Sequence, residues 1–242
     1  MGRNFNFLAW GCLFFAFFIL ALQSCSSTFE KEKADTHKAF FENTSSERDE
    51  YLILVNSGNP LDKNYVPSDL VDIKSTRADG REVQKMRKAA SVALESMIEE
   101  MKRLGVYDEN LTVTSGYRSF EYQKYLFDTY VKNRTDSGMS YDEAYKDVSK
   151  TTALPGCSEH QSGLCVDFHN KSYANVSFAE TEQYKWIEKS AHSFGFIVRY
   201  PSGKENITGI SFEPWHLRYV GEKNATKMYE NSLCLEEYLA AL

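Results

Sequence analysis

One stretch constrains the fold of this chain more than any other. LPGCSEHQSGLCVDFH, residues 154–169, holds two histidines, two cysteines, an aspartate and two glycines. Its segment GLCVDFH alternates as a β-strand does, which places Cys165, Asp167 and His169 on one face. His160 precedes this strand from a loop with a glycine pivot. A loop histidine and a strand aspartate can converge on one metal ion, so the stretch predicts half of a metal site beside a sheet.

The other half is predicted in EPWH, residues 213–216, which follows a predicted strand and offers both a histidine and a carboxylate. Two histidines and an aspartate (His160, Asp167 and His216) around zinc leave a fourth position open for water, as in catalytic sites. Glu213 could then take a proton from that water as general base. Taken singly, these residues fit a buried histidine, a capping aspartate and a solvent-facing glutamate. Together they favour zinc.

The rest of the chain predicts an α+β fold in which helices flank a small, mostly antiparallel sheet. Apolar residues recur every three or four positions over residues 81–104, and Gly105 follows as a helix C-cap glycine would. Ser140 and Glu143 form a capping box that opens another helix. Further helices are predicted at 120–132, 181–194 and 222–242, and strands at 51–55, 111–114, 196–200 and 207–212.

Charge and length restrict the class of protein. The formal net charge of −6 argues against nucleic acid or an anionic membrane surface as the main partner. The 242 residues suffice for one well-buried domain and an extension. We expect the protein to be a monomer.

That extension is predicted to be a signal peptide over residues 1–25. Residues 7–22 are almost wholly apolar, about the length of a signal-peptide core and slightly short for a membrane span of ~20 residues. The run ends in LQSC, which resembles a bacterial lipobox with Cys25 as the lipidated mature N-terminus; an uncleaved anchor helix or ordinary signal-peptidase cleavage are the alternatives. All three place the protein outside the cytoplasmic membrane. We therefore predict a membrane-tethered lipoprotein with a polar tether at 26–50 and its domain at 51–242.

Four segments carry a resemblance to a known family: LVNSGNPLDKNYVPSDL, TSGYRSFEYQ, SEHQSGLCVD and GFIVRYPSGKENITGISFEPWHLRYVG. In order and spacing they are similar to the VanY-type D-alanyl-D-alanine carboxypeptidases, zinc peptidases that share a fold with lysostaphin-type peptidases and the hedgehog signalling domain. The resemblance covers roughly residues 51–221 and implies that fold. It also implies that His160, Asp167 and His216 bind Zn²⁺ and that Glu213 is the catalytic base.

The resemblance assigns roles to four more residues. Arg118 would hold the substrate near the scissile bond and help to stabilise the oxyanion, because its planar donors match paired oxygens. Ser158 would lie beside the zinc, within reach of the substrate backbone, and Ser115 and Gln123 would line the pocket.

Cys165 departs from the family, which has a small residue, usually alanine, at that position. It could be a small buried hydrophobe, a disulfide partner for Cys157 or a competing soft ligand for the metal. Buried free thiols are the alternative to a disulfide, and Cys234 is the third cysteine of the domain. His169 is expected either to contact a metal ligand without binding the metal itself, or to lie at the surface.

The implied activity is zinc-dependent removal of the terminal D-alanine from peptidoglycan stem peptides or their lipid-linked precursors. One alternative is an L,D-carboxypeptidase acting on tetrapeptide stems, because such relatives share all the zinc motifs. The other is a non-catalytic, zinc-containing module that binds the cell wall; the intact Glu213 argues against it.

Overall fold

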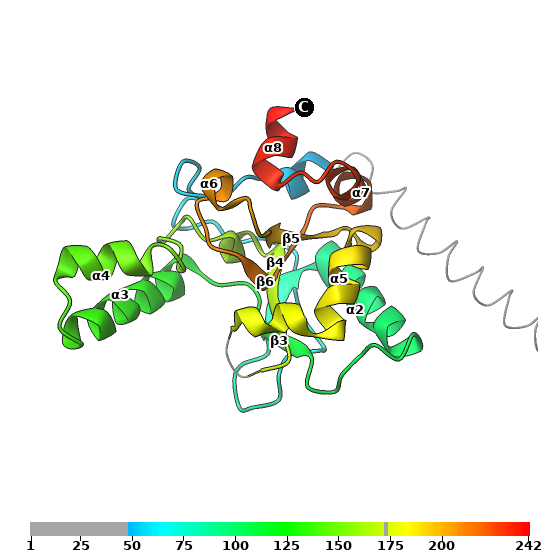
Figure 1. Ribbon diagram of the computed structural model, residues 1–242, viewed down its shortest axis with the longest axis horizontal. Coiled ribbons are helices and arrows are strands. Elements are labelled where there is room, and N and C mark those ends of the chain that lie inside the picture. The colour runs from blue at the N-terminus through cyan, green and yellow to red at the C-terminus, as the bar shows by residue number, and fades with distance from the viewer. Residues whose placement is uncertain (1–47, 172–173) are drawn as a thin grey trace, which may run out of the picture. The chain divides into compact units, whose positions relative to one another are not determined.

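Four strands form an antiparallel sheet at the centre of the described part of the chain (Figure 1). The computed structural model describes residues 48–171 and 174–242. The strands lie in the order β3 (Thr112–Ser115), β4 (Cys165–His169), β6 (Glu213–Tyr219) and β5 (Phe196–Tyr200). A smaller sheet pairs β1 (Leu70–Asp72) with β2 (Lys85–Arg87). The α+β class with a small antiparallel sheet is confirmed.

The register of the central sheet brings distant residues together. Asp167 of β4 lies opposite His216 of β6 and opposite Ser115 of β3. Because opposite residues of antiparallel strands point to the same face, the side chains of Asp167 and His216 are neighbours. The 3₁₀ helix Glu159–Ser162, just before β4, places His160 beside them.

Helices surround this sheet (Figure 1). They are α2 (Lys88–Arg103), α3 (Phe120–Asp136), α4 (Tyr141–Val148), α5 (Glu182–Ser190), α6 (Glu205–Thr208), α7 (Glu222–Glu230) and α8 (Leu235–Ala240). Met97 and Met101 of α2 are fully buried, which confirms this helix as amphipathic with its apolar stripe in the core. The capping box of Ser140 and Glu143 is present at the start of α4. Helices α3 and α4 pack against each other around Phe127 and Ala144.

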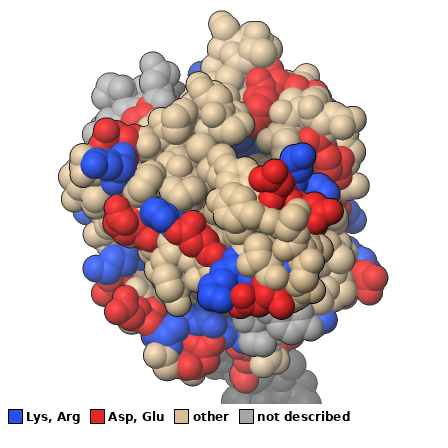
Figure 2. All heavy atoms as spheres, turned by 90° about the vertical axis from the view of Figure 1, so that its left-hand side faces the viewer, with Lys and Arg blue, Asp and Glu red and all other residues tan. Residues whose placement is uncertain are grey.

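The face that carries α3 and α4 mixes charges of both signs (Figure 2). Ion pairs join Lys132 to Asp136 along α3 and Arg134 of α3 to Asp147 of α4. Exposed pairs of this kind contribute at most about 1 kcal/mol each. They therefore favour solubility more than stability.

The strand predicted at 51–55 is wrong. Residues Arg48–Leu52 form a 3₁₀ helix, and residues 53–55 have no regular structure. The carbonyl oxygens of Tyr51 and Ile53 accept hydrogen bonds of 2.9 and 2.8 Å from Nη2 of Arg218. This backbone is thus paired with a buried guanidinium instead of with a neighbouring strand.

The strand predicted at 207–212 is wrong as well. Helix α6 occupies its start and ends at Thr208; Gly209 caps it with a φ of +74°, in the left-handed region that favours glycine. The strand begins only at Glu213, so EPWH forms the start of β6 and does not follow a strand as predicted. Pro214 lacks an N–H, and the pairing of β5 with β6 shifts its register at this end.

Several predictions concern the N-terminal part of the chain. The leader at 1–25, Cys25 as its lipidation site and most of the tether at 26–50 lie outside the described residues. Over 48–171 and 174–242, no helix combines the length and the apolar character needed to cross a membrane.

The cysteines of the domain, Cys157, Cys165 and Cys234, are free thiols. Of the two alternatives for the stretch at 154–169, the structure has free thiols and no disulfide between Cys157 and Cys165.

Candidate active site

The structure brings the buried His160 and His216 together with the partly exposed Asp167 into one group, which we call the His–Asp–His cluster. Nε2 of His160 lies 3.3 Å from Oδ1 of Asp167, and Nδ1 of His216 lies 3.2 Å from the same oxygen. The two imidazole rings meet edge to face with centroids 4.9 Å apart. Three residues from three different elements therefore direct one donor atom each at a common point.

The geometry of the cluster fits a tetrahedral zinc ion. Zinc bonds of about 2.0–2.2 Å separate tetrahedral ligand atoms by roughly 3.3–3.6 Å, close to both measured distances. Nε2 of His160 and Oδ1 of Asp167 are buried without a hydrogen-bond partner. Buried polar atoms are normally paired, so these two unpaired atoms fit the role of metal ligands.

The backbone of Gly116 orients the ring of His160 and fixes its tautomer. Nδ1 of His160 lies 2.7 Å from the carbonyl oxygen of Gly116, which selects the tautomer with a free lone pair on Nε2. Burial, assisted by the charge of Arg118, lowers the pKa of His160 to about 4, so the ring is neutral at neutral pH. A Cβ on Gly116 would lie 2.4 Å from the carbonyl oxygen of Lys85, so only glycine permits this close approach.

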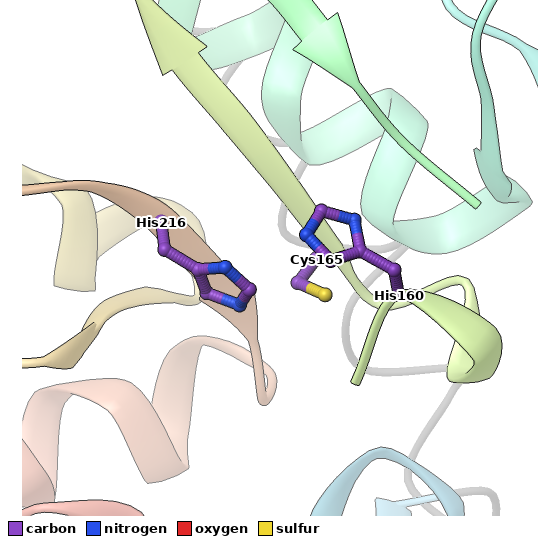
Figure 3. Close-up of side chains that lie close together, drawn as sticks. All are labelled: His160, Cys165 and His216. Carbon is purple, nitrogen blue, oxygen red and sulfur yellow. The ribbon is translucent and has the colours of Figure 1, made fainter. Parts of the chain in front are cut away.

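Cys165 offers a second donor set. Donor atoms of His160, Cys165 and His216 lie within 4.8 Å of one another, and Figure 3 shows the sulfur beside the two rings. Oδ1 of Asp167, for its part, lies 3.3 and 3.2 Å from nitrogens of the same two histidines. Burial also raises the pKa of the Cys165 thiol, and the neutral thiol is a weak metal ligand. Asp167 therefore stays the predicted third ligand.

Replacing Cys165 with alanine tests this choice. The C165A variant should bind one zinc ion with wild-type affinity, because the His–Asp–His cluster stays complete, and should lose about 1 kcal/mol of stability from the small cavity. Zinc content by mass spectrometry and thermal unfolding measure both. A substantial loss of zinc affinity in C165A would make the sulfur a ligand.

Glu213 lies at the edge of the cluster, at the start of β6. Its Oε2 is 3.7 Å from Nδ1 of His216, and its side chain is 12% exposed. Burial, reinforced by the nearby carboxylate of Asp167, raises the pKa of Glu213 to about 7. A carboxyl group with this pKa can both accept and return a proton at neutral pH.

The raised pKa also predicts how the stability of the zinc-free protein depends on pH. The protonated form of Glu213 stabilises the fold fully below its ordinary pKa of 4.5, and this contribution is lost as the pH rises through about 7. The loss is about 3 kcal/mol for a shift of this size. In chelator-treated protein, Glu213→Gln should remove most of this loss, because glutamine has no proton to release. Urea unfolding at pH 5 and pH 8 measures it, and an unchanged pH dependence in the variant would contradict it.

Arg118 faces the same site and is held by Gln123. Nη1 of Arg118 donates to Oε1 of Gln123 at 2.9 Å, and Nε2 of Gln123 donates to the carbonyl oxygen of Ala153 at 2.7 Å. Nε of Arg118 is buried without a partner, so it is available to an anionic group of a ligand. The chemistry that this arrangement supports is binding of a carboxylate or an oxyanion.

A cavity of about 180 Å³ unites these groups. It is lined by the His–Asp–His cluster together with Glu213, Arg118, Gln123 and Ser158. Ser115 does not line it, contrary to expectation, but lines a neighbouring cavity of about 920 Å³ that shares Arg118. His169 is buried and lies 2.9 Å from Oγ1 of Thr114 through its Nε2, outside the cavity lining.

Two tyrosines of the site were missed at the level of sequence. Tyr130 of α3 and Tyr200 of β5 line the cavity, and the ring of Tyr200 lies 4.9 Å from that of His216. No motif marks either residue, because aromatic residues at helix and strand spacing look like ordinary core positions.

A His–Asp–His cluster with an open side and an adjacent carboxyl group is the arrangement of a zinc-dependent hydrolase site. The chain belongs to the VanY family of D-alanyl-D-alanine carboxypeptidases, which matches residues 83–222. The assignment of individual residues as ligands, base and substrate contacts stays a prediction.

Known proteins resemble the chain over most of the described part. The putative carboxypeptidase YodJ of Bacillus subtilis (strain 168) is 40% identical over 192 residues, which are 77% of this chain and 66% of YodJ. The chain thus spans slightly less than two thirds of the length of the first curated relatives. The solved LdcB LD-carboxypeptidase has 39% identity and a TM-score of 0.69, covering 78% of this chain and 86% of its own. A vancomycin-resistance D,D-pentapeptidase VanY, solved with Zn(II), has 37% identity and a TM-score of 0.66. The match covers 78% of this chain and 99% of the VanY chain.

Proposed function

We propose that the protein is a zinc-dependent D,D-carboxypeptidase that removes the terminal D-alanine from peptidoglycan stem peptides. The observation that carries this proposal is the His–Asp–His cluster. Oδ1 of Asp167 lies at tetrahedral separations from a nitrogen of each histidine, and the cluster includes buried atoms without hydrogen-bond partners. Membership of the VanY family and the Zn(II) bound to a solved relative support the metal and the substrate class.

The residues of the chain divide the work of hydrolysis. When bound by the His–Asp–His cluster, zinc supplies Lewis-acid chemistry, which activates a water molecule and polarises the scissile carbonyl group. Glu213 takes the proton from the attacking water and passes it to the nitrogen of the leaving D-alanine. The free Nε–H of Arg118 stabilises the negative charge that develops on the carbonyl oxygen or pairs with the terminal carboxylate.

Synthetic stem peptides test the activity. The full chain should release one D-alanine from a pentapeptide stem when zinc is present, and mass spectrometry should show the tetrapeptide product. Chelator and Glu213→Ala should each abolish the product. The variant should still bind zinc. If the zinc-loaded protein cleaves neither pentapeptide nor tetrapeptide, a non-catalytic module that binds the cell wall becomes the better explanation.

A second activity has a specific observation in its favour. LdcB, an LD-carboxypeptidase, matches the chain at least as well as VanY does in both identity and TM-score. The same assay separates the two activities, because an L,D-carboxypeptidase shortens the tetrapeptide and leaves the pentapeptide intact.

We further propose that the enzyme is a lipoprotein outside the cytoplasmic membrane, where stem peptides and lipid-linked precursors are found. The apolar run at 7–22 and the LQSC sequence support a lipid on Cys25. Wild-type protein expressed in a bacterium should partition into detergent and carry a diacylglycerol on Cys25 by mass spectrometry. The Cys25→Ala variant should lack the lipid, and a wild-type N-terminus without it would overturn the proposal.

A further inference from the structure

Glu159 immediately precedes His160 and is buried, yet the mechanism above does not use it. Its side chain has no exposed surface. Oε1 of Glu159 accepts hydrogen bonds from Nε of Arg199 at 2.8 Å and from Nη1 of Arg218 at 2.7 Å. A buried carboxylate with two guanidinium partners is firmly oriented.

The two arginines are themselves held in place. Arg199 makes a two-point contact with Glu236 of α8, at 2.9 and 2.6 Å. Arg218 donates through Nε to the carbonyl oxygen of Tyr219, and through Nη2 to the segment before β1. We call Glu159, Arg199, Arg218 and Glu236 the buried charge network. Its two positive and two negative charges balance.

The second oxygen of Glu159 points toward the metal site. Oε2 is buried without a hydrogen-bond partner and lies 3.8 Å from Nε2 of His216, which also has none. A neutral imidazole has one donor nitrogen and one acceptor nitrogen. Because Nδ1 of His216 faces Asp167 and the metal position, a metal there requires the hydrogen on Nε2, directed at Glu159.

We propose that Glu159 is a positioning residue, whose free oxygen accepts the Nε2–H of His216 and thereby presents Nδ1 of that ring to the metal. The proposal rests on the metal site of the proposed function. The gap of 3.8 Å closes to a hydrogen bond of about 2.9 Å with a shift of roughly 0.9 Å. The buried charge network keeps the carboxylate ready for this contact and links helix α8 to the metal site.

Glu159→Gln tests the proposal with little change in shape. The glutamine oxygen can still accept from the arginines, but its amide then turns an N–H toward Nε2 of His216. This donor opposes the tautomer that the metal needs. Zinc affinity, measured by competition with a chromogenic chelator, should fall about 10- to 100-fold, as when other hydrogen-bond partners of metal-bound histidines are removed.

Two matched variants separate positioning from general stability. Glu236→Gln weakens the same network at its far end, and Cys165→Ala removes another neighbour of His216. Both should leave the zinc affinity within about threefold of wild type, which is small beside the expected change. An equal loss of affinity in Glu236→Gln, or wild-type affinity in Glu159→Gln, would overturn the proposal.

Nuclear magnetic resonance of the zinc-loaded wild type gives a readout that needs no variant. The Nε2–H proton of His216 should resonate far downfield and exchange slowly with water, because a buried carboxylate accepts it. A rapidly exchanging proton would reject the contact with Glu159 even if Glu159→Gln does not fold. If the wild type does not bind zinc at all, the proposed function fails; if it binds zinc and cleaves peptides but lacks this proton signal, only the role of Glu159 fails.

Discussion

Glu213→Gln is expected to lower kcat for stem-peptide hydrolysis by about 10²–10⁴-fold, the usual contribution of a general base. Glutamine occupies the same space but cannot accept the proton of the attacking water. The side chain of Glu213 is nearly buried beside His216, and no other carboxyl group outside the His–Asp–His cluster and Glu159 lines the cavity within the described residues. Neighbouring groups therefore offer no replacement base.

Steady-state kinetics and zinc content should be measured on the same Glu213→Gln preparation. Zinc content should equal that of the wild type and KM should change little, because the variant alters a step after binding. If kcat were within tenfold of wild type with zinc bound, Glu213 would not be the base.

Asp167→Ala is expected to reduce activity to background by removing the metal. Oδ1 of Asp167 is the common neighbour of both histidine donors, at 3.3 and 3.2 Å, and is the anionic member of the His–Asp–His cluster. Loss of a hydrogen-bond partner behind a ligand already lowers metal affinity about 10- to 100-fold. Loss of the charged ligand itself should exceed that range.

Chelation provides the matched comparison for Asp167→Ala. Chelator-treated wild type should lose its activity and regain it when zinc is added, whereas Asp167→Ala should stay inactive at the same zinc concentration. Competition with a chromogenic chelator measures the affinity of each protein. Wild-type zinc affinity in Asp167→Ala would move the third ligand to Cys165, the other donor beside the two histidines.

Local sequence patterns predicted several elements correctly. The periodicity over 81–104 predicted α2, and the structure moves only its start, to Lys88, because Lys85–Arg87 pair with β1 instead. The alternation in GLCVDFH predicted β4, whose pairing with β6 brings Asp167 next to His216. Periodicity is set by the chain itself, so these elements could be found without knowledge of their neighbours.

Patterns failed where a distant partner decides the local conformation. The apolar run at 51–55 has the composition of a strand, but its carbonyl oxygens face Arg218, which lies more than 150 residues later in the chain. Ser115 precedes Arg118 by only three positions, yet sheet pairing directs it to the larger cavity. Hydrogen bonds between remote segments cannot be predicted from local composition.

The sequence by itself determined the chemistry of the site: which residue types are present, their spacing, and their likeness to the VanY family. These follow from motifs whose members lie within a few residues of each other, such as the histidine and carboxylate of EPWH. Only the tertiary structure decided that Oδ1 of Asp167 lies 3.2 Å from Nδ1 of His216 and that Oε2 of Glu159 lies 3.8 Å from Nε2 of the same ring. Those outcomes depend on distances of a few ångströms between β4, β6 and the 3₁₀ helix before β4, and such distances exist only once the sheet register is set.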